Sequence, residues 1–141
     1  PSVDTRYDDT HIVSHDENLI RSTPVSHSSN ILLLSNQCSV VGIDEVQYFD
    51  AGVVEVAQQL ANRGIRVIVA GLDMDFSGKP FGPMPHLLAV AEYVTKVHAI
   101  CVRCGNIASH SYRLVDNQEQ VMLGEKNEYE PRCRSCFLKK D

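Results

Sequence analysis

The alternation of apolar and polar segments predicts a βαβ unit in the middle of the chain. Residues 40–43 (VVGI) form a short, continuously apolar run, typical of a strand buried on both faces of a parallel sheet. Residues 52–64 carry apolar side chains at helical spacing, with Asp50 as a candidate N-cap and Gly64 as a candidate helix stop. A second apolar run, residues 66–73 (RVIVAGLD), again ends on an acid. Strand, helix and strand in this order predict two parallel strands joined by a right-handed crossover.

The same alternation continues toward residue 100 and then stops. Residues 84–97 predict a second helix, and residues 98–101 (HAIC) predict a third short strand. This pattern predicts an α/β fold, a parallel sheet flanked by helices, with ligands at the carboxyl ends of the strands. Residues 1–30 are polar and are predicted to be irregular, with one short strand in HIVSH. Because the chain then becomes polar and cysteine-bounded, we expect two domains, 1–100 and 101–141.

Composition narrows the class of protein. Of the 141 residues, 43% are hydrophobic and 22% are charged, as in ordinary soluble globular proteins. The net charge of −5 argues against a nucleic-acid binder, which needs a basic surface. No apolar run approaches the roughly 20 residues of a membrane helix, and no signal-peptide pattern opens the chain. The five cysteines, an odd count without a secretory signal, favour a reducing compartment and metal binding over disulfides.

Two CxxC motifs, CVRC and CRSC, are the most specific chemical signal. Cys101 and Cys104 form the first pair, and Cys133 and Cys136 form the second. Each motif makes a tight turn that directs two thiolates to one point, so two motifs complete a tetrahedral metal site. We expect structural Zn²⁺; a dithiol redox pair and unliganded thiols are the alternatives. Cys38 is predicted to be a small apolar residue beside a strand.

Two adjacent acids, Asp44 and Glu45, end the first predicted strand. Successive side chains of a strand point to opposite faces, so the two acids cannot share a task unless the chain turns there. We expect divided roles, one carboxylate at Mg²⁺ and the other at a nucleophile, as in nucleotide enzymes. The alternative is an acidic strand end that enters solvent. No GxxxxGK[ST] phosphate loop occurs in the chain. The nearest imitation is SGKP (77–80), which has Asp73 in place of the first glycine and is not followed by a predicted helix start.

Two loops carry further candidates. Residues 72–85 place Phe76 and Phe81 among Gly and Pro, where the rings can wall a flat ligand. The alternative is a rigid turn whose rings cap the core. Residues 4–9 (DTRYDD) place Arg6 where it can reach a phosphate, or simply in a solvated loop.

Four segments together resemble the type II thymidine kinase family: GIDEVQYFD, VIVAGLDMDFSGKPFGPMP, AICVRCGNIASHSYRL and EYEPRCRSC. They match in order and at family spacing over nearly the whole chain. The resemblance implies a P-loop NTPase-like nucleotide-binding domain joined to a small zinc-ribbon or lasso domain. It also implies transfer of the ATP γ-phosphate to the 5′-hydroxyl of thymidine, which gives dTMP in nucleotide salvage for DNA synthesis.

The resemblance assigns a role to each matched residue. Glu45 would be the general base for the 5′-hydroxyl, Asp44 would help to hold Mg²⁺, Asp4 would lie near the metal, and Arg6 near the phosphates. The four cysteines of the CxxC motifs would bind zinc. The substrate-binding residues would be Leu72, Phe76, Phe81, Ser111, Met122, Leu123, Gly124, Tyr129 and Tyr48.

Within that set the implied tasks differ. Ser111 would lie beside the thymine methyl, and the backbone of 122–124 would read the base edge. Tyr129 would pack on the nucleoside from the lasso. Tyr48 stands where many relatives have Phe, and it adds a hydroxyl near the sugar.

The chain departs from the family in two places. The first strand and the phosphate loop are absent, and we expect them upstream of Pro1, because a parallel sheet without a central strand would expose its apolar faces. The loop around Asn117–Gln118 is shorter than in many relatives. The resemblance further implies a homotetramer and feedback inhibition by dTTP in the thymidine site. The rival hypotheses are a non-catalytic zinc-ribbon-bearing module that binds a nucleotide or a partner, and an ATPase acting on nucleic acid, which the acidic charge disfavours.

Overall fold

The computed structural model describes residues 11–13, 19–115 and 128–139, which form two compact units. Unit 1 contains the described chain up to Leu72 together with Gly82–Val90. Unit 2 contains Asp73–Phe81 and the described chain from Ala91 onward. Among the described residues, no helix is both long enough and apolar enough to cross a bilayer.

The expected domain boundary at residue 100 stays a prediction. By their contacts, Asp73–Phe81 and the residues from Ala91 to Ile100 belong to unit 2. Phe76 lies against the guanidinium of Arg113, 3.7 Å from its ring centroid. Lys96 forms an ion pair with Asp73 at 2.6 Å. These contacts join residues that are 37 and 23 positions apart, which a change in local composition does not reveal.

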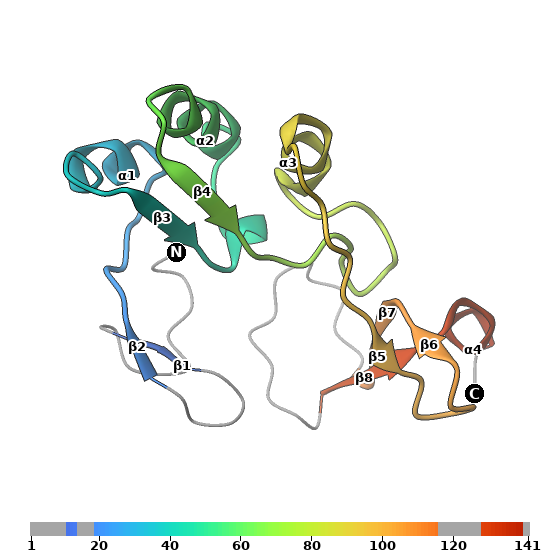
Figure 1. Ribbon diagram of the computed structural model, residues 1–141. Helices are drawn as coiled ribbons and strands as arrows, with labels where there is room; N and C mark the ends of the chain where they lie inside the picture. Colours follow the sequence, from blue (N-terminus) through green and yellow to red (C-terminus); the bar gives the residue numbers. More distant parts are fainter. Residues whose placement is uncertain (1–10, 14–18, 116–127, 140–141) are drawn as a thin grey trace. The chain divides into compact units, whose positions relative to one another are not determined.

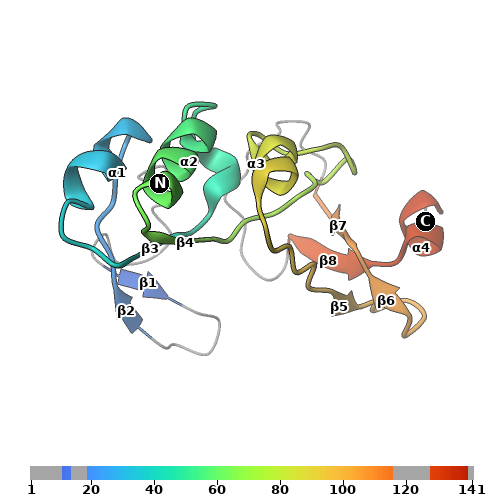
Figure 2. The same ribbon diagram turned by 45° about the horizontal axis from the view of Figure 1, so that its top comes forward.

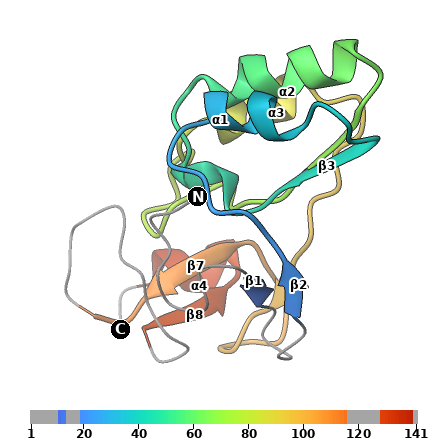
Figure 3. The same cartoon turned by 90° about the vertical axis from the view of Figure 1, so that its left-hand side faces the viewer.

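Unit 1 is built on two parallel strands with two helices on the same side (Figures 1 and 3). Strand β3 (Val40–Ile43) pairs in parallel with β4 (Arg66–Val69). Helix α2 (Val53–Asn62) connects them, and helix α1 (Ser29–Leu34) precedes β3. The predicted strand–helix–strand unit is therefore confirmed, whereas α1 was not predicted.

The core of unit 1 lies between the strand pair and its helices. Because side chains alternate along a strand, one face of the pair is covered and the other meets solvent. Val40 and Ile68 are each 55% exposed, so the expected burial of both faces is wrong for the described residues. The buried core consists of Ile31, Ile43, Val46, Phe49, Val53, Val56, Ala57, Leu60, Met84 and Leu87.

The predicted end of α2 is confirmed, whereas its predicted N-cap is wrong. Gly64 has a positive φ of 81° and donates its N–H to the Ala61 carbonyl, which confirms the predicted stop. The N-cap is Gly52, not Asp50. The Asp50 carboxylate instead accepts hydrogen bonds from the Ser28 N–H at 2.9 Å and the Ser28 hydroxyl at 2.7 Å. Asp50 also accepts the Gly52 N–H at 3.0 Å, so it links the residue before α1 to the N-cap of α2.

Two later elements are shorter than predicted. Helix α3 (Met84–Val90) ends seven residues before the expected position, and Tyr93 and Val97 beyond it are 87% and 86% exposed. The β-branched residues that follow favour extended backbone. Strand β5 (Ala99–Ile100) pairs antiparallel with β6 (Ile107–Ala108), so it does not extend the parallel sheet.

The remaining strands form two more antiparallel pairs. In unit 2, β7 (His110–Arg113) pairs with β8 (Tyr129–Arg132), and the short helix α4 (Arg134–Leu138) follows β8 (Figure 2). In unit 1, β1 (His11–Val13) pairs with β2 (Leu19–Arg21). Strand β1 lies in the predicted HIVSH segment, whereas β2 was not predicted.

Candidate functional site

The two adjacent acids lie where β3 gives way to the 3₁₀ helix η1 (Val46–Tyr48). Glu45 has left-handed backbone angles, φ 51° and ψ 41°, which are uncommon for a residue other than glycine. Asp44 Oδ1 accepts a hydrogen bond from the Glu45 N–H at 2.9 Å. The chain therefore turns between the two acids, and the strict alternation of a strand does not separate their side chains.

A glutamine that the sequence analysis missed joins this turn to the end of β4. Gln47 is 3% exposed, and its Nε2 donates to Glu45 Oε2 at 2.5 Å. Its Oε1 accepts the Leu72 N–H at 3.0 Å. The Tyr48 N–H donates to the Glu45 carbonyl at 3.1 Å. Unit 1 thus brings together four predicted site residues: Asp44, Glu45, Tyr48 and Leu72. Gln47 was not predicted, and its polar side chain among the mainly apolar residues of VQYF was the available signal.

The SGKP segment has no capacity to cradle phosphate. Asp75 is 5% exposed, and its Oδ1 accepts hydrogen bonds from the Ser77 N–H, the Ser77 hydroxyl and the Lys79 N–H. The Gly78 N–H donates to the Asp75 carbonyl. Because the donors of this turn already bind a carboxylate and a carbonyl, its interpretation as a phosphate loop is excluded.

Unit 2 brings two predicted nucleoside-pocket residues together around an arginine. The Arg113 guanidinium lies 3.7 Å from the Phe76 ring centroid and donates to the Tyr129 hydroxyl at 2.7 Å. Arg113 is 8% exposed and was not singled out from the sequence. Phe81 is buried, as expected of a ring that caps a core, and Ser111 is half-buried on β7.

Several predicted residues lie elsewhere. Leu72 belongs to unit 1 and is 47% exposed, whereas Phe76, Phe81 and Tyr129 belong to unit 2. Five others lie outside the described residues: Asp4, Arg6, Met122, Leu123 and Gly124.

The four cysteines of the CxxC motifs gather in unit 2. Their sulfur atoms all lie within 4.8 Å of one another, and those of Cys104 and Cys133 are 3.6 Å apart. Four thiolates around one zinc ion, with bonds of about 2.3 Å, place the sulfurs about 3.8 Å apart. The donor set therefore fits a metal ion such as zinc. Cys38 is exposed and belongs to unit 1.

Backbone hydrogen bonds favour the thiolate form of two of these cysteines. The Cys133 N–H lowers the pKa of Cys101 to about 6, and the Cys136 N–H lowers the pKa of Cys133. The pKa of Cys136 is raised to about 12 because its thiol shares hydrogen bonds with Cys104 and Cys133. Thiolates are the metal-binding form of cysteine, so the two turns are built to receive a cation.

A charged clip connects the two CxxC turns. Glu130 Oε1 accepts hydrogen bonds from Arg103 Nε at 3.0 Å and Arg132 Nε at 2.6 Å. Arg132, which is 1% exposed, also donates to the Cys136 carbonyl at 3.3 Å and stacks over Tyr112. Arg103 and Arg132 lower the pKa of Glu130 through these hydrogen bonds. Positive charge is therefore fixed beside both pairs of thiols.

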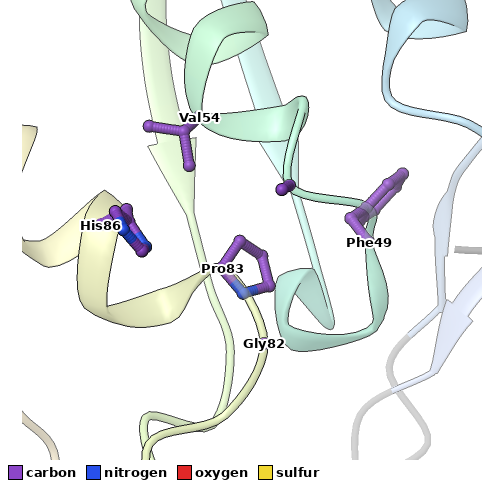
Figure 4. A pocket seen from close by; sticks show the side chains of 6 residues that line it. Phe49, Val54, Gly82, Pro83 and His86 are labelled. Carbon is purple, nitrogen blue, oxygen red and sulfur yellow. The ribbon is translucent and has the colours of Figure 1, made fainter.

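Unit 1 also contains an apolar pocket of about 350 Å³, lined from the end of η1, the first turns of α2 and the start of α3 (Figure 4). None of the predicted site residues lines it. The lining residues are Phe49, Ala51, Val54, Gly82, Pro83 and His86.

Comparisons with known proteins identify the family of this chain. A family model described as thymidine kinase matches residues 1–137. A thymidine kinase of Porphyromonas gingivalis is 65% identical over 139 residues, which are 99% of this chain and 68% of the relative. A thymidine kinase of Bacteroides thetaiotaomicron is 60% identical over 99% of this chain and 70% of the relative. With most of its length matched by the family model and by relatives of such identity, the chain belongs to the thymidine kinase family.

Proposed function

We propose that this chain is the catalytic and nucleoside-binding part of a kinase that converts thymidine and ATP into dTMP and ADP. Membership of the thymidine kinase family supports the overall reaction. The observation that carries the chemistry is the turned acidic pair at the end of β3, where Asp44 and Glu45 follow a parallel strand. Carboxyl ends of parallel strands are where α/β proteins bind ligands.

Glu45 acts as the general base that accepts the proton of the 5′-hydroxyl. Phosphoryl transfer depends mainly on positioning and charge neutralisation, so the carboxylate must be held in one direction. The hydrogen bond from Gln47 provides such a restraint. Asp44 serves Mg²⁺, since carboxylate oxygens are the ligands this ion prefers. When bound with ATP, Mg²⁺ would supply positive charge against the phosphates. By the family resemblance, Asp4 would serve the metal and Arg6 the phosphates.

The nucleoside lies against aromatic side chains of unit 2. Phe76 and Tyr129 provide ring surfaces, and Arg113 holds both of them by contact and hydrogen bond. Ser111 lies beside the thymine methyl. The other contacts come from Leu72, Phe81, Tyr48 and the lasso residues Met122, Leu123 and Gly124.

Zinc in the four-cysteine site has a structural task. Four thiolates complete a tetrahedral site and leave no open position for catalysis. The buried Arg132 and its partner Arg103 lie beside the turns that carry the thiols, which offsets the negative charge of the ligands. We assign residues 101–141 to a zinc-binding lasso domain and residues 1–100 to a P-loop NTPase-like domain.

Regulation and assembly follow the family resemblance. We propose a cytoplasmic homotetramer in which dTTP inhibits by occupying the thymidine site. Light scattering of the purified protein gives the oligomeric state, and thymidine-competitive inhibition by dTTP tests the site of regulation.

The direct test is ATP-dependent phosphorylation of tritiated thymidine by the full-length protein, compared with its Glu45→Gln variant. Loss of a general base lowers kcat by roughly 10²–10⁴-fold. Glu55→Gln is the matched control, because Glu55 also accepts a hydrogen bond from a glutamine but lies exposed on α2. Wild-type kcat in the Glu45→Gln variant would refute the general-base assignment. A wild-type protein that binds thymidine without phosphorylating it would favour the non-catalytic module.

A further inference from the structure

The buried glutamine of η1 has an orientation that its partners fix. A backbone N–H can only donate, so the hydrogen bond from the Leu72 N–H identifies the side-chain oxygen of Gln47. The NH₂ group must then face Glu45, whose Oε2 accepts it at 2.5 Å. Gln47 is 3% exposed, so water has little access to its side-chain amide. One amide therefore connects the proposed base to the segment that follows β4.

Two glycines show how closely this glutamine is enclosed. A Cβ at Gly71 would lie 2.7 Å from Gln47 Oε1, and a Cβ at Gly82 would lie 2.2 Å from the Gln47 carbonyl oxygen. Both separations are below 3.0 Å, which real Cβ atoms essentially never show. The backbone of two other segments of unit 1 thus packs directly against the side chain and the main chain of Gln47.

The strand end is held to η1 by the backbone as well. The Val46 N–H donates to the Ala70 carbonyl at 3.1 Å. Three interactions therefore hold the acidic turn against the segment after β4: this backbone bond, the close packing around Gln47, and the hydrogen bond from the Leu72 N–H. A side chain that lacked either polar end would lose one of these two hydrogen bonds.

We propose that Gln47 is a positioning residue that directs the Glu45 carboxylate toward the 5′-hydroxyl and couples it to Leu72 at the edge of the nucleoside site. This inference rests on the proposed function of Glu45 as the base. Gln47 does not touch the reacting atoms; it acts through Glu45 on one side and through Leu72 on the other. The two ends of the amide should accordingly affect different kinetic constants.

Two substitutions separate the two ends. Gln47→Glu keeps the oxygen that accepts the Leu72 N–H but removes the donor to Glu45 and places a second carboxylate beside it. Its kcat should fall roughly tenfold or more, with the KM for thymidine nearly unchanged. Gln47→Met removes both hydrogen bonds, so its kcat should fall and its KM for thymidine should also rise several-fold. Equal constants in wild type and in both variants would overturn the proposal.

A double-mutant cycle distinguishes positioning from a general loss of structure. In the Glu45→Gln background, Gln47→Met should lower the residual kcat by less than twofold, because the group through which it acts is gone. The same fold-loss in both backgrounds would mean that Gln47 is merely structural and would refute the proposal. If Gln47→Met does not fold, the same cycle with Gln47→Glu decides the question, since that variant keeps the side-chain shape and the bond to Leu72.

Gln59→Met is the matched control, because Gln59 also donates its amide to a carboxylate, Glu55, on the exposed side of α2. It should leave kcat and KM within twofold of wild type. The two proposals fail in different ways. Full activity in Glu45→Gln refutes the base assignment, whereas an inactive Glu45→Gln beside a fully active Gln47→Met refutes only the positioning role of Gln47.

Discussion

Replacement of Gly82 by alanine should damage both stability and catalysis, although Gly82 contacts no predicted substrate group. Gly82 has φ 49°, a left-handed conformation that costs an L-residue about 1–2 kcal/mol. A Cβ there would lie 2.2 Å from the Gln47 carbonyl oxygen. To restore even the 3.0 Å lower limit of real Cβ contacts, the backbone must move by about 0.8 Å. Overpacking of this kind adds about 1–3 kcal/mol.

Gly64→Ala is the matched control, because Gly64 also has a positive φ, 81°, but nothing lies within 4 Å of its added Cβ. The two variants should therefore differ by the cost of the clash alone, about 1–3 kcal/mol. For a chain of this size, that cost corresponds to a difference of roughly 2–12 °C in Tm. Thermal unfolding of the full-length variants under identical conditions measures it.

Catalysis should separate the same two variants. The displaced carbonyl belongs to Gln47, whose side chain holds Glu45, and a misplacement of about 1 Å can cost 100-fold in rate. We expect kcat to fall roughly 10- to 100-fold in Gly82→Ala and to stay within twofold of wild type in Gly64→Ala. If both variants had the same Tm and the same kcat, the reasoning from the close approach of residue 82 to Gln47 would be refuted.

Three further predictions concern the metal, the charged clip and the core. Metal analysis should give about one zinc per chain, and Cys133→Ser should lower that content and the stability of unit 2, whereas the exposed Cys38→Ser should change neither. The folded-state pKa of Glu130 lies below its ordinary 4.5, so its stabilisation is present above that pH and disappears as pH falls through the folded pKa. Glu130→Gln should accordingly lose stability at neutral pH and show a shallower decline in acid, and an unchanged pH–stability curve would contradict the clip. Leu60→Ala, at a fully buried position, should cost about 2–5 kcal/mol in denaturant unfolding, against less than about 0.5 kcal/mol for the exposed Leu33→Ala.

Local patterns in the sequence determined a substantial part of this protein. The strand–helix–strand unit follows from two short, continuously apolar runs and the 3.6-residue periodicity between them, and the end of α2 follows from the conformational freedom of Gly64. The cysteine group follows from CxxC spacing, because each motif shapes its own turn. These signals succeed because the interactions they encode span only a few residues.

Contacts between distant residues decided the rest. No local pattern states that Gln47 meets Leu72, that Arg113 lies between Phe76 and Tyr129, or that Lys96 pairs with Asp73. The same limit explains the overlong prediction for α3 and the expected burial of both strand faces, since the number of neighbours that cover a segment is a property of the packed chain.

The acidic pair shows both contributions at one place. That two carboxylates end an apolar strand can be read from the sequence alone. The turn at Glu45 and the buried amide that holds its carboxylate depend on packing between distant segments of the chain. The physical reason is that a left-handed backbone and a fixed side-chain direction cost free energy, and the contacts that offset this cost come from residues 71, 72 and 82, far along the chain.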